Sequence, residues 1–417
     1  MATAEATLSL RLERLRPALG PSFGIGSLAL LAVAVAAGHP AESPLSPDHP
    51  GGDRGWSWVY LGALAGSFLL YLGGIAATRH RTARLAPVLA VAVVIQVTPL
   101  AGPVLLSTDA YTYWAYGRLA AIHGENPYDV TPSRFPDDPA YPVMGADWQE
   151  TTSVYGPGFT LLSEGHAALV GESPSTAAWA YRAIATICML ALVALAARLG
   201  ERRAFAAAFV GWNPLLAVHF AGGGHNDALM MTLVLAALAL AASRRPTLTG
   251  ISWAASIAIK WVPLIFLALR AIEARATGRP VRHLGFAIVA GVIVALALWR
   301  YGLGWIGAVI PLARNFEKQA VYSIPHRFSD LTGVSEGAAA ALFAATFALA
   351  LLWLAREAWR GRARLGLAAG LMLVCTPWLV PWYAVWAVPL AAIDEDRTAR
   401  VLALGMSAYL LRDAVPL

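Results

Sequence analysis

Apolar runs separated by short polar loops recur along almost the whole chain. Most of these runs are close to the ~20 residues that an α-helix needs to cross a bilayer. Inside a bilayer the backbone must satisfy its own hydrogen bonds, which a helix does. The pattern predicts an all-α, polytopic transmembrane helical bundle of about 10–13 membrane segments. The expected spans are residues 20–38, 56–77, 85–106, 176–198, 205–221, 226–243, 284–303, 337–355, 365–380 and 399–415.

Some apolar segments are broken or too short for a simple span, and we expect re-entrant, interfacial or hairpin segments there. They are residues 156–171, 247–269 and 381–393. No internal repeat is evident, so the paired halves of many secondary transporters find no support. We predict one integral-membrane domain over residues 1–417, with a cytoplasmic leader at 1–19. The first apolar run, Phe23 to Gly38, is interpreted as an uncleaved helix, with a cleaved signal peptide as the alternative.

Composition strengthens the membrane prediction. The 417 residues are 58% hydrophobic and only 13% charged, whereas soluble proteins carry about 25% charged residues. The net charge of +6 does not indicate a nucleic-acid partner, because the arginines lie in short loops between apolar runs. Both cysteines, Cys188 and Cys375, lie inside apolar segments, so neither a disulfide framework nor a cysteine metal site is expected.

Arginine clusters predict the orientation of the chain. All clusters fall on one side if the segments 156–171 and 247–269 do not cross the membrane, and the positive-inside rule makes that side cytoplasmic. The clusters are Arg11, Arg14 and Arg16; Arg79, Arg81 and Arg84; Arg198, Arg202 and Arg203; Arg244 and Arg245; Arg270, Arg275, Arg279 and Arg282; and Arg356, Arg360, Arg362 and Arg364. The loops 39–55, 107–155, 222–225 and 304–336 are then extracytoplasmic. Loop 107–155 is the largest between spans, and loops of that length are usually functional.

Asp109 follows the apolar run Leu85 to Leu106 and opens a polar, aromatic stretch that is predicted to be helical through about His123. A carboxylate at the lip of a membrane helix is costly unless its charge is used. Its position suits a base that meets a lipid-linked substrate at the membrane surface. On a helix, Asp109, Tyr113 and Tyr116 lie near one face. The alternative is a helix N-cap beside an interfacial aromatic belt.

A second polar group stands between two apolar spans, where Gly222-Gly223-Gly224 precedes His225, Asn226 and Asp227. Three glycines allow the backbone to approach another group closely. These side chains are expected on the same side as Asp109, which favours a site, although Asn226 or Asp227 could simply cap the next helix. No metal site is expected, because no other His/Asp cluster has suitable spacing.

Two further features carry positive charge. Lys260 lies deep in an apolar stretch, and a buried ammonium usually has a partner. Pro263 suggests a broken helix that lets Lys260 point into a cavity and hold an anion such as phosphate; snorkelling to the interface is the alternative. The external stretches Arg314–Lys318 and Pro325–Arg327 place cations against the positive-inside trend, which fits either anion binding or ordinary loop charges.

Three other motifs are weaker. Tyr155-Gly156-Pro157-Gly158 closes loop 107–155, either pinning it over a cavity or forming a plain turn. Pro377 to Tyr383 is an aromatic break that suits stacking on sugars or prenyl chains, or simple packing. Asp394-Glu395-Asp396 matches the D-x-D pattern of metal-dependent nucleotide-sugar enzymes, but it lacks alternating strands and helices around it. We interpret it as a solvated charge run in a cytoplasmic loop.

Taken in order, these motifs resemble a known family over about residues 85–393. The matching residues are Ser107-x-Asp109-x-Tyr111-x-Tyr113, Tyr116-Gly117-Arg118, Asn126-Pro127-Tyr128, Tyr155-Gly156-Pro157, Trp212-Asn213-Pro214, Gly224-His225-Asn226-Asp227, Lys260-x-x-Pro263 and Pro381-Trp382-Tyr383. The series resembles the polytopic glycosyltransferases of the C superfamily. Among these it is most similar to the polyprenyl-phosphomannose-dependent α-1,6-mannosyltransferases of lipomannan assembly.

The resemblance implies an inverting transfer of mannose from a polyprenyl-phosphate donor to a glycan or glycolipid hydroxyl at the outer face of the cell membrane. It implies that Asp109 is the general base, and that no cofactor or metal ion is needed. The implied donor phosphate ligands are, in order of preference, Lys260, Arg327 and Arg118. The implied substrate-binding residues are Tyr111, Tyr113, Asn126, Tyr128, Tyr155, His225, Asn226, Asp227, Trp382 and Tyr383.

Some points stay open at this stage. Arg314 to Asp330 does not match the family's external C-terminal region, so the acceptor is undetermined, and relatives that transfer arabinose or glucose share the architecture. The rival interpretation is a transporter or flippase of lipid-linked saccharides, which predicts charges near the midplane of several spans. Here the polar clusters collect at helix mouths on one face, which favours surface chemistry. A structural subunit of an envelope-synthesis complex would leave the Asp109 cluster unused.

Overall fold

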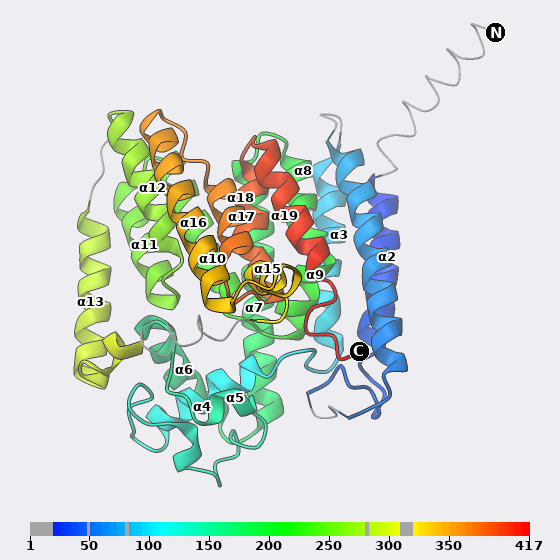
Figure 1. Cartoon of the computed structure of the whole chain (residues 1–417), viewed down its shortest axis with the longest axis vertical. Helices are drawn as coiled ribbons and strands as arrows, with labels where there is room; N and C mark the ends of the chain where they lie inside the picture. Colours follow the sequence, from blue (N-terminus) through cyan, green and yellow to red (C-terminus); the bar gives the residue numbers. More distant parts are fainter. Residues whose placement is uncertain (1–19, 48–50, 80–82, 280–282, 309–319) are drawn as a thin grey trace, which may run out of the picture.

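The computed structural model describes residues 20–47, 51–79, 83–279, 283–308 and 320–417, and within these ranges the regular structure is helical throughout. The predicted leader 1–19 and the stretch Arg314–Lys318 lie outside the described residues. Figure 1 shows most helices side by side in a bundle, with α4, α5 and α6 gathered beyond one end of it. The predicted all-α, polytopic membrane fold is confirmed.

Within the described ranges, four helices are long and apolar enough to cross a membrane: α2 (Gly55–Thr78), α7 (Pro174–Leu199), α13 (Leu284–Tyr301) and α16 (Glu336–Trp359). Counted together as one span rather than as a re-entrant loop, α8 (Arg203–Gly211) and the helical segment Pro214–Gly222 form a fifth, bent by 51° at their junction. The remaining elements of the bundle are the helix Gly20–Ala36, α3 (Leu85–Val97), α10 (Asp227–Ala242), α11 (Pro246–Ile259), α12 (Pro263–Ala276), α15 (Ile324–Thr332), α17 (Leu365–Cys375), α18 (Ala384–Ile393) and α19 (Arg397–Tyr409).

The bend in the fifth span comes from the predicted Trp212-Asn213-Pro214 motif. The Asn213 side chain accepts hydrogen bonds from the N–H groups of Leu215 and Leu216, so it caps the new helix that starts at Pro214. The Trp212 indole N–H donates to the Val88 carbonyl at 3.0 Å. This motif therefore has a structural role in the described fold.

Helices α10, α11 and α12 form an antiparallel series that places Lys260 at the end where Asp109 lies. Ser243, after α10, accepts a hydrogen bond from Arg198 at the end of α7, whereas Asp227 at the start of α10 bonds Lys260 after α11. The chain then turns back through α12, where Glu273 accepts from the Ala363 N–H. Segment 247–269 is therefore a hairpin with Lys260 at its apex, one of the expected alternatives. At 14 residues, α11 is only about 21 Å long.

The opposite end of the bundle, which we call the arginine end, gathers many of the predicted cytoplasmic arginines. Arg79 and Arg400 both lie over the Phe205 ring, at 5.7 Å and 5.0 Å. A cavity of about 620 Å³ also opens here, lined in part by Arg270, Arg364 and Asp394, and none of the predicted site residues lines it.

The interpretation of Asp394-Glu395-Asp396 as a solvated run is wrong for two of its three residues. Asp394 accepts a hydrogen bond from the Gly366 N–H at 2.8 Å. Asp396 caps α19 and accepts from Arg364 at 2.7 Å. Only Glu395 is exposed. These carboxylates hold the loops of the arginine end together.

The region beyond the bundle consists of α4 (Asp109–Ala121), α5 (Ala146–Gln149) and α6 (Pro157–Val170) with their loops. Arg118, on α4, donates from Nε to both oxygens of Asp138 at 2.8 and 2.9 Å, and His123 contacts the same carboxylate at 2.6 Å. Burial pushes the pKa of Asp138 upward, but the hydrogen bonds from Arg118, the Ala140 N–H and His123 outweigh it and hold the pKa below its usual value. This cluster ties the loop after α4 back onto the helix.

We predict that Asp138→Asn destabilises the protein by about 3 kcal/mol, because it leaves the Arg118 guanidinium buried without a counter-charge. The measurement is the apparent melting temperature in detergent. Because folding lowers the pKa of Asp138, its contribution is complete above the unfolded value of about 3.9 and is lost as the pH falls through the lower folded value. The exposed neighbour Asp137, changed to Asn, is the matched control and should leave the melting temperature unchanged.

Candidate active site

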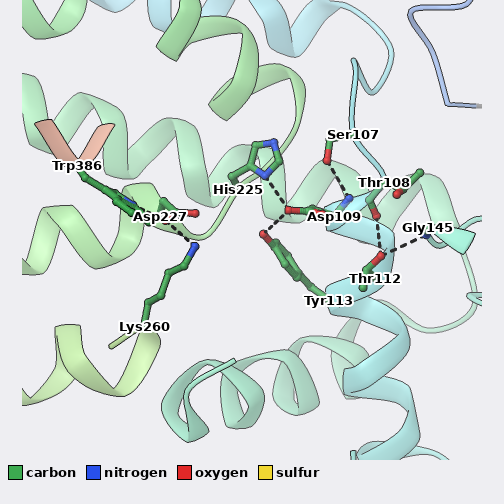
Figure 2. Close-up of polar contacts among 10 residues, drawn as sticks. All are labelled: Ser107, Thr108, Asp109, Thr112, Tyr113, Gly145, His225, Asp227, Lys260 and Trp386. Carbon is green, nitrogen blue, oxygen red and sulfur yellow. Dashed lines mark hydrogen bonds and ion pairs between the residues drawn. The ribbon is translucent and has the colours of Figure 1, made fainter. Parts of the chain in front are cut away.

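Asp109 is the first residue of α4, and its carboxylate is held from two sides (Figure 2). Its Oδ2 accepts a hydrogen bond from the Tyr113 hydroxyl at 3.2 Å and lies 3.0 Å from His225 Nδ1. The Asp109 side chain is 14% exposed, whereas that of His225 is fully buried. Thr108, not Asp109, occupies the N-cap position. The carboxylate is therefore engaged with side chains of the site rather than with the end of its own helix.

Tyr113 is expected to remain a hydrogen-bond donor to Asp109. Burial first, and then the negative charge of Asp109, raise the pKa of Tyr113 well above its usual value. Its ring packs edge-on against Tyr155 at 5.1 Å and Phe159 at 4.9 Å. Tyr155, a predicted site residue, thus supports the residue that holds Asp109.

The glycine turn brings His225 to Asp109. Gly224 has φ +78°, a conformation that favours glycine, and a Cβ there would lie 3.3 Å from Arg182 and 3.4 Å from Ala110. The turn therefore packs directly against the first turn of α4. Leu105, which precedes Asp109 in the chain, also donates its N–H to the Gly222 carbonyl at 3.2 Å.

Arg182, on α7, links the same two segments and was not predicted from the sequence. It is only 4% exposed. Its Nε donates to the Ala221 carbonyl at 2.7 Å, and one terminal nitrogen donates to the carbonyls of Pro99 and Gly102 at 2.6 and 2.9 Å. One guanidinium thus clamps the backbone before Asp109 to the backbone before His225. The only sequence signal was an arginine inside an apolar span, away from any loop cluster.

Asp227 and Lys260 form a second centre next to the first (Figure 2). Asp227 Oδ1 accepts from Lys260 Nζ at 2.8 Å and from the Trp386 indole N–H at 2.6 Å. The Asp227 side chain is fully buried, and Lys260 is 19% exposed. The Lys260 ammonium also lies 4.5 Å from the centre of the Tyr383 ring, a cation–π contact. Trp386, on α18, is a site residue that the sequence did not reveal.

The Pro377–Tyr383 break supplies the aromatic wall of both centres. The Trp382 ring stacks on His225, with centroids 3.7 Å apart and planes 13° apart. Tyr383 stacks on Trp386 at 3.8 Å. These two adjacent aromatic residues therefore contact different centres. Trp382 lies against His225 of the Asp109 centre, and Tyr383 lies beside Lys260 of the Asp227 centre.

The Tyr155-Gly156-Pro157-Gly158 motif packs against the end of α11 and so fixes the position of Lys260, which follows that helix. The Gly156 N–H donates to the Ile259 carbonyl at 3.3 Å. A Cβ on Gly156 would lie 2.2 Å from the Ala258 carbonyl oxygen, and one on Gly158 would lie 2.8 Å from the Ala258 Cβ. Only glycine permits this approach, so the start of α6 rests directly against the end of α11, one residue before Lys260.

Several predicted site residues have other contacts. Arg118 is occupied by Asp138, and Arg327 lies over Tyr322 and 3.9 Å from Asp330; neither guanidinium contacts the two carboxylate centres among the described residues. Asn126 donates to the Tyr301 carbonyl, and the Tyr128 hydroxyl to the Tyr155 carbonyl, so both support the loop region between α4 and α6. Tyr111 is buried in the first turn of α4. Arg118 and Arg327 each have a carboxylate beside them in this structure, whereas Lys260 lies at the two centres; the assignment of all three to the donor phosphate stays a prediction.

The fold and the site define a polytopic helical membrane protein with two carboxylates at one end of its bundle, Asp227 fully buried and Asp109 partly exposed. Two family models match the chain: the N-terminal domain of α-(1→6)-mannopyranosyltransferase over residues 23–275, and the MptB C-terminal domain over residues 326–416. The first model covers more than half of the chain, so the chain belongs to the α-(1→6)-mannopyranosyltransferase family. The resemblance carried by the motifs is thereby confirmed.

Individual relatives agree with this assignment. A probable α-(1→6)-mannopyranosyltransferase of Mycolicibacterium smegmatis is 28% identical, over 70% of this chain and 62% of its own length. α-(1→6)-Mannopyranosyltransferase A of Mycobacterium tuberculosis is 27% identical, over 74% of this chain and 65% of its own length. The chain thus spans less than two thirds of the length of these relatives. No solved structure matches the chain.

We predict that Gly156→Ala lowers the apparent melting temperature and displaces Lys260, because the new methyl group would overlap the Ala258 carbonyl. The expected cost is about 1–3 kcal/mol. Gly165, in the middle of the same helix, has open space around its Cβ position and is the matched control. Gly165→Ala should stabilise the helix by roughly 0.5–1 kcal/mol. Equal melting temperatures for the two variants would contradict the close approach.

Proposed function

We propose that this protein is an inverting mannosyltransferase that uses polyprenyl-phosphate-mannose and a glycan or glycolipid hydroxyl at the outer face of the cell membrane. The observation that carries the proposal is the Asp109 carboxylate, held by His225 and Tyr113 yet still 14% exposed. The family supports mannose as the sugar and α-(1→6) as the linkage. The position of the arginine end supports an outward-facing Asp109 by the positive-inside rule.

Asp109 acts as the general base. An acceptor hydroxyl oxygen attacks the anomeric carbon from the face opposite the phosphate, and its proton passes to an oxygen of Asp109. The bond between the anomeric carbon and the phosphate oxygen breaks, and polyprenyl phosphate leaves with the electron pair. Inversion turns a β-linked mannosyl phosphate into an α-mannoside. His225 and Tyr113 both contact Oδ2, which leaves Oδ1 for the acceptor.

Lys260 stabilises the leaving phosphate. An ammonium group has three N–H donors, and Asp227 uses one of them at 2.8 Å. Two donors then remain for a ligand, and 19% of the Lys260 side chain is exposed. Charge that develops on the departing phosphate is stabilised most strongly by a cation already held in place. Asp227, Tyr383 and Trp386 supply that placement through the contacts described above.

We predict that Asp109→Asn lowers the transfer rate by about 10²–10⁴-fold, the usual contribution of a general base. The measurement is mannose transfer by the purified protein in lipid, from synthetic polyprenyl-phosphomannose to an α-mannoside. Asparagine keeps the shape of the side chain, so the melting temperature should change little. Asp137→Asn, in the exposed loop, should transfer at the wild-type rate. Full activity of Asp109→Asn would disprove the base assignment.

If the wild-type protein transfers no sugar from any polyprenyl-phosphate donor but moves a lipid-linked saccharide across vesicle membranes, the proposed reaction is wrong and the protein is a transporter. The same preparation serves both assays, which makes the two outcomes directly comparable.

We predict that Lys260→Gln lowers kcat/KM for the donor by about 10²-fold, while Lys260→Arg retains more activity because it retains the charge. Lys260→Gln also leaves Asp227 buried and unpaired. The double variant Lys260→Gln with Asp227→Asn removes both charges and separates the two effects. Recovery of the wild-type rate in the double variant would show that Lys260 only neutralises Asp227, which contradicts a phosphate role.

A further inference from the structure

Five buried polar atoms on the segment from His219 to Asp227 have no hydrogen-bond partner among the described residues. They are His219 Nδ1, His225 Nε2, Asn226 Nδ2, Asn226 Oδ1 and Asp227 Oδ2. All four residues are at most 5% exposed. Leaving a buried polar atom unpaired costs about 1–3 kcal/mol, and native proteins have few such atoms. A ligand or bound water would satisfy these five atoms, which lie within nine residues of sequence.

His219 reaches this group through an unusual turn. It lies in the π-helical turn Val218–Gly222, and isolated π-helical turns occur frequently at functional sites. The His219 ring centre is 6.0 Å from that of His225 and 5.9 Å from that of Trp382. It thus packs in the same aromatic group as the histidine that contacts Asp109.

The chemistry of the unpaired atoms suits sugar hydroxyls and not phosphate. A hydroxyl both donates and accepts hydrogen bonds, and the Asn226 amide offers one donor group and one acceptor group at fixed spacing. Asp227 Oδ2 and Asn226 Oδ1 can only accept, so they would repel a phosphate oxygen. Each imidazole nitrogen can take either role according to its tautomer. The phosphate side of the site is instead marked by Lys260.

We infer that His219 and Asn226 form hydrogen bonds with the hydroxyl groups of the transferred sugar and thereby determine the sugar specificity of this site. The inference rests on the proposed function and adds a residue, His219, that packs near His225 and Trp382. Because these atoms are closed to water here, the sugar reaches them when the side chains above them rearrange. Trp382 stacks on His225 and is partly exposed, so a movement of its ring would uncover that histidine.

The test compares kcat/KM for polyprenyl-phosphomannose and its 2-, 3- and 4-deoxy analogues in wild type and His219→Phe. We expect the wild type to lose about tenfold or more on the analogue that lacks the hydroxyl read by His219. His219→Phe should lose a similar factor on the parent donor and nothing further on that analogue. His219→Asn should recover part of the loss, because its amide places a polar atom two bonds from Cβ, where Nδ1 lies.

His166 provides a matched control. It lies on α6 and packs against Tyr181 of α7, with ring centres 4.0 Å apart, and no contact between His166 and Asn226 is seen among the described residues. His166→Phe should affect all donors equally. Asn226→Ala, measured on the same donors, provides a second independent measurement if His219→Phe does not fold, and it should erase discrimination at one hydroxyl.

A uniform loss on every donor in both His219→Phe and Asn226→Ala, or no loss at all, would overturn the inference and assign the unpaired atoms to buried water. Either result, obtained with a wild type that transfers mannose and an Asp109→Asn variant that does not, leaves the proposed function intact. A wild type that transfers from no donor would instead overturn the proposed function together with the inference.

Discussion

The buried ion pair between Asp227 and Lys260 is the interaction on which the site depends. Each charge alone would be expensive to bury, so the two must stay together and remain hydrogen-bonded. Asp227 opens α10 and Lys260 follows α11, so their 2.8 Å contact fixes where the hairpin of α11 and α12 turns back. The Trp386 N–H, at 2.6 Å from the same carboxylate oxygen, adds α18 to this junction.

Close backbone approaches set the positions of the charged groups around that pair. Gly156 lets the start of α6 touch the end of α11 beside Lys260, and Gly224 lets the turn before His225 touch α4 beside Asp109. Arg182 donates hydrogen bonds to three backbone carbonyls and so links the segment before His225 to the segment before Asp109. The positions of Asp109 and Lys260 are thus set by contacts between backbone segments, which move less than contacts between flexible side chains. Such rigid placement is what a site needs when its groups must meet a developing charge without rearranging.

The two carboxylates have different surroundings and are suited to different tasks. Asp109 is contacted by a tyrosine and a histidine and remains partly exposed, which suits the proposed role of proton acceptor. Asp227 is fully buried and bonded to an ammonium and an indole, so its charge is committed to holding Lys260. The unpaired atoms of His219, Asn226 and Asp227 add hydrogen-bond donors and acceptors of both kinds, as the hydroxyl groups of a sugar require.

The sequence by itself determined the membrane fold and most of the candidate site. A polar residue in or beside an apolar span costs free energy to bury in the membrane, so its presence there indicates a functional position. Asp109, His225, Asp227 and Lys260 all stood out in this way. It did not determine which charges pair, since the partners are up to 116 residues apart. Arg118 was assigned to the phosphate, yet Asp138 folds back onto it. Arg182, His219 and Trp386 lie inside apolar helices, and the hydrophobic pattern of such a helix does not indicate which other helix packs against each of its faces. Only tertiary packing decides which helix faces which, and so only the structure could bring these three residues to the site.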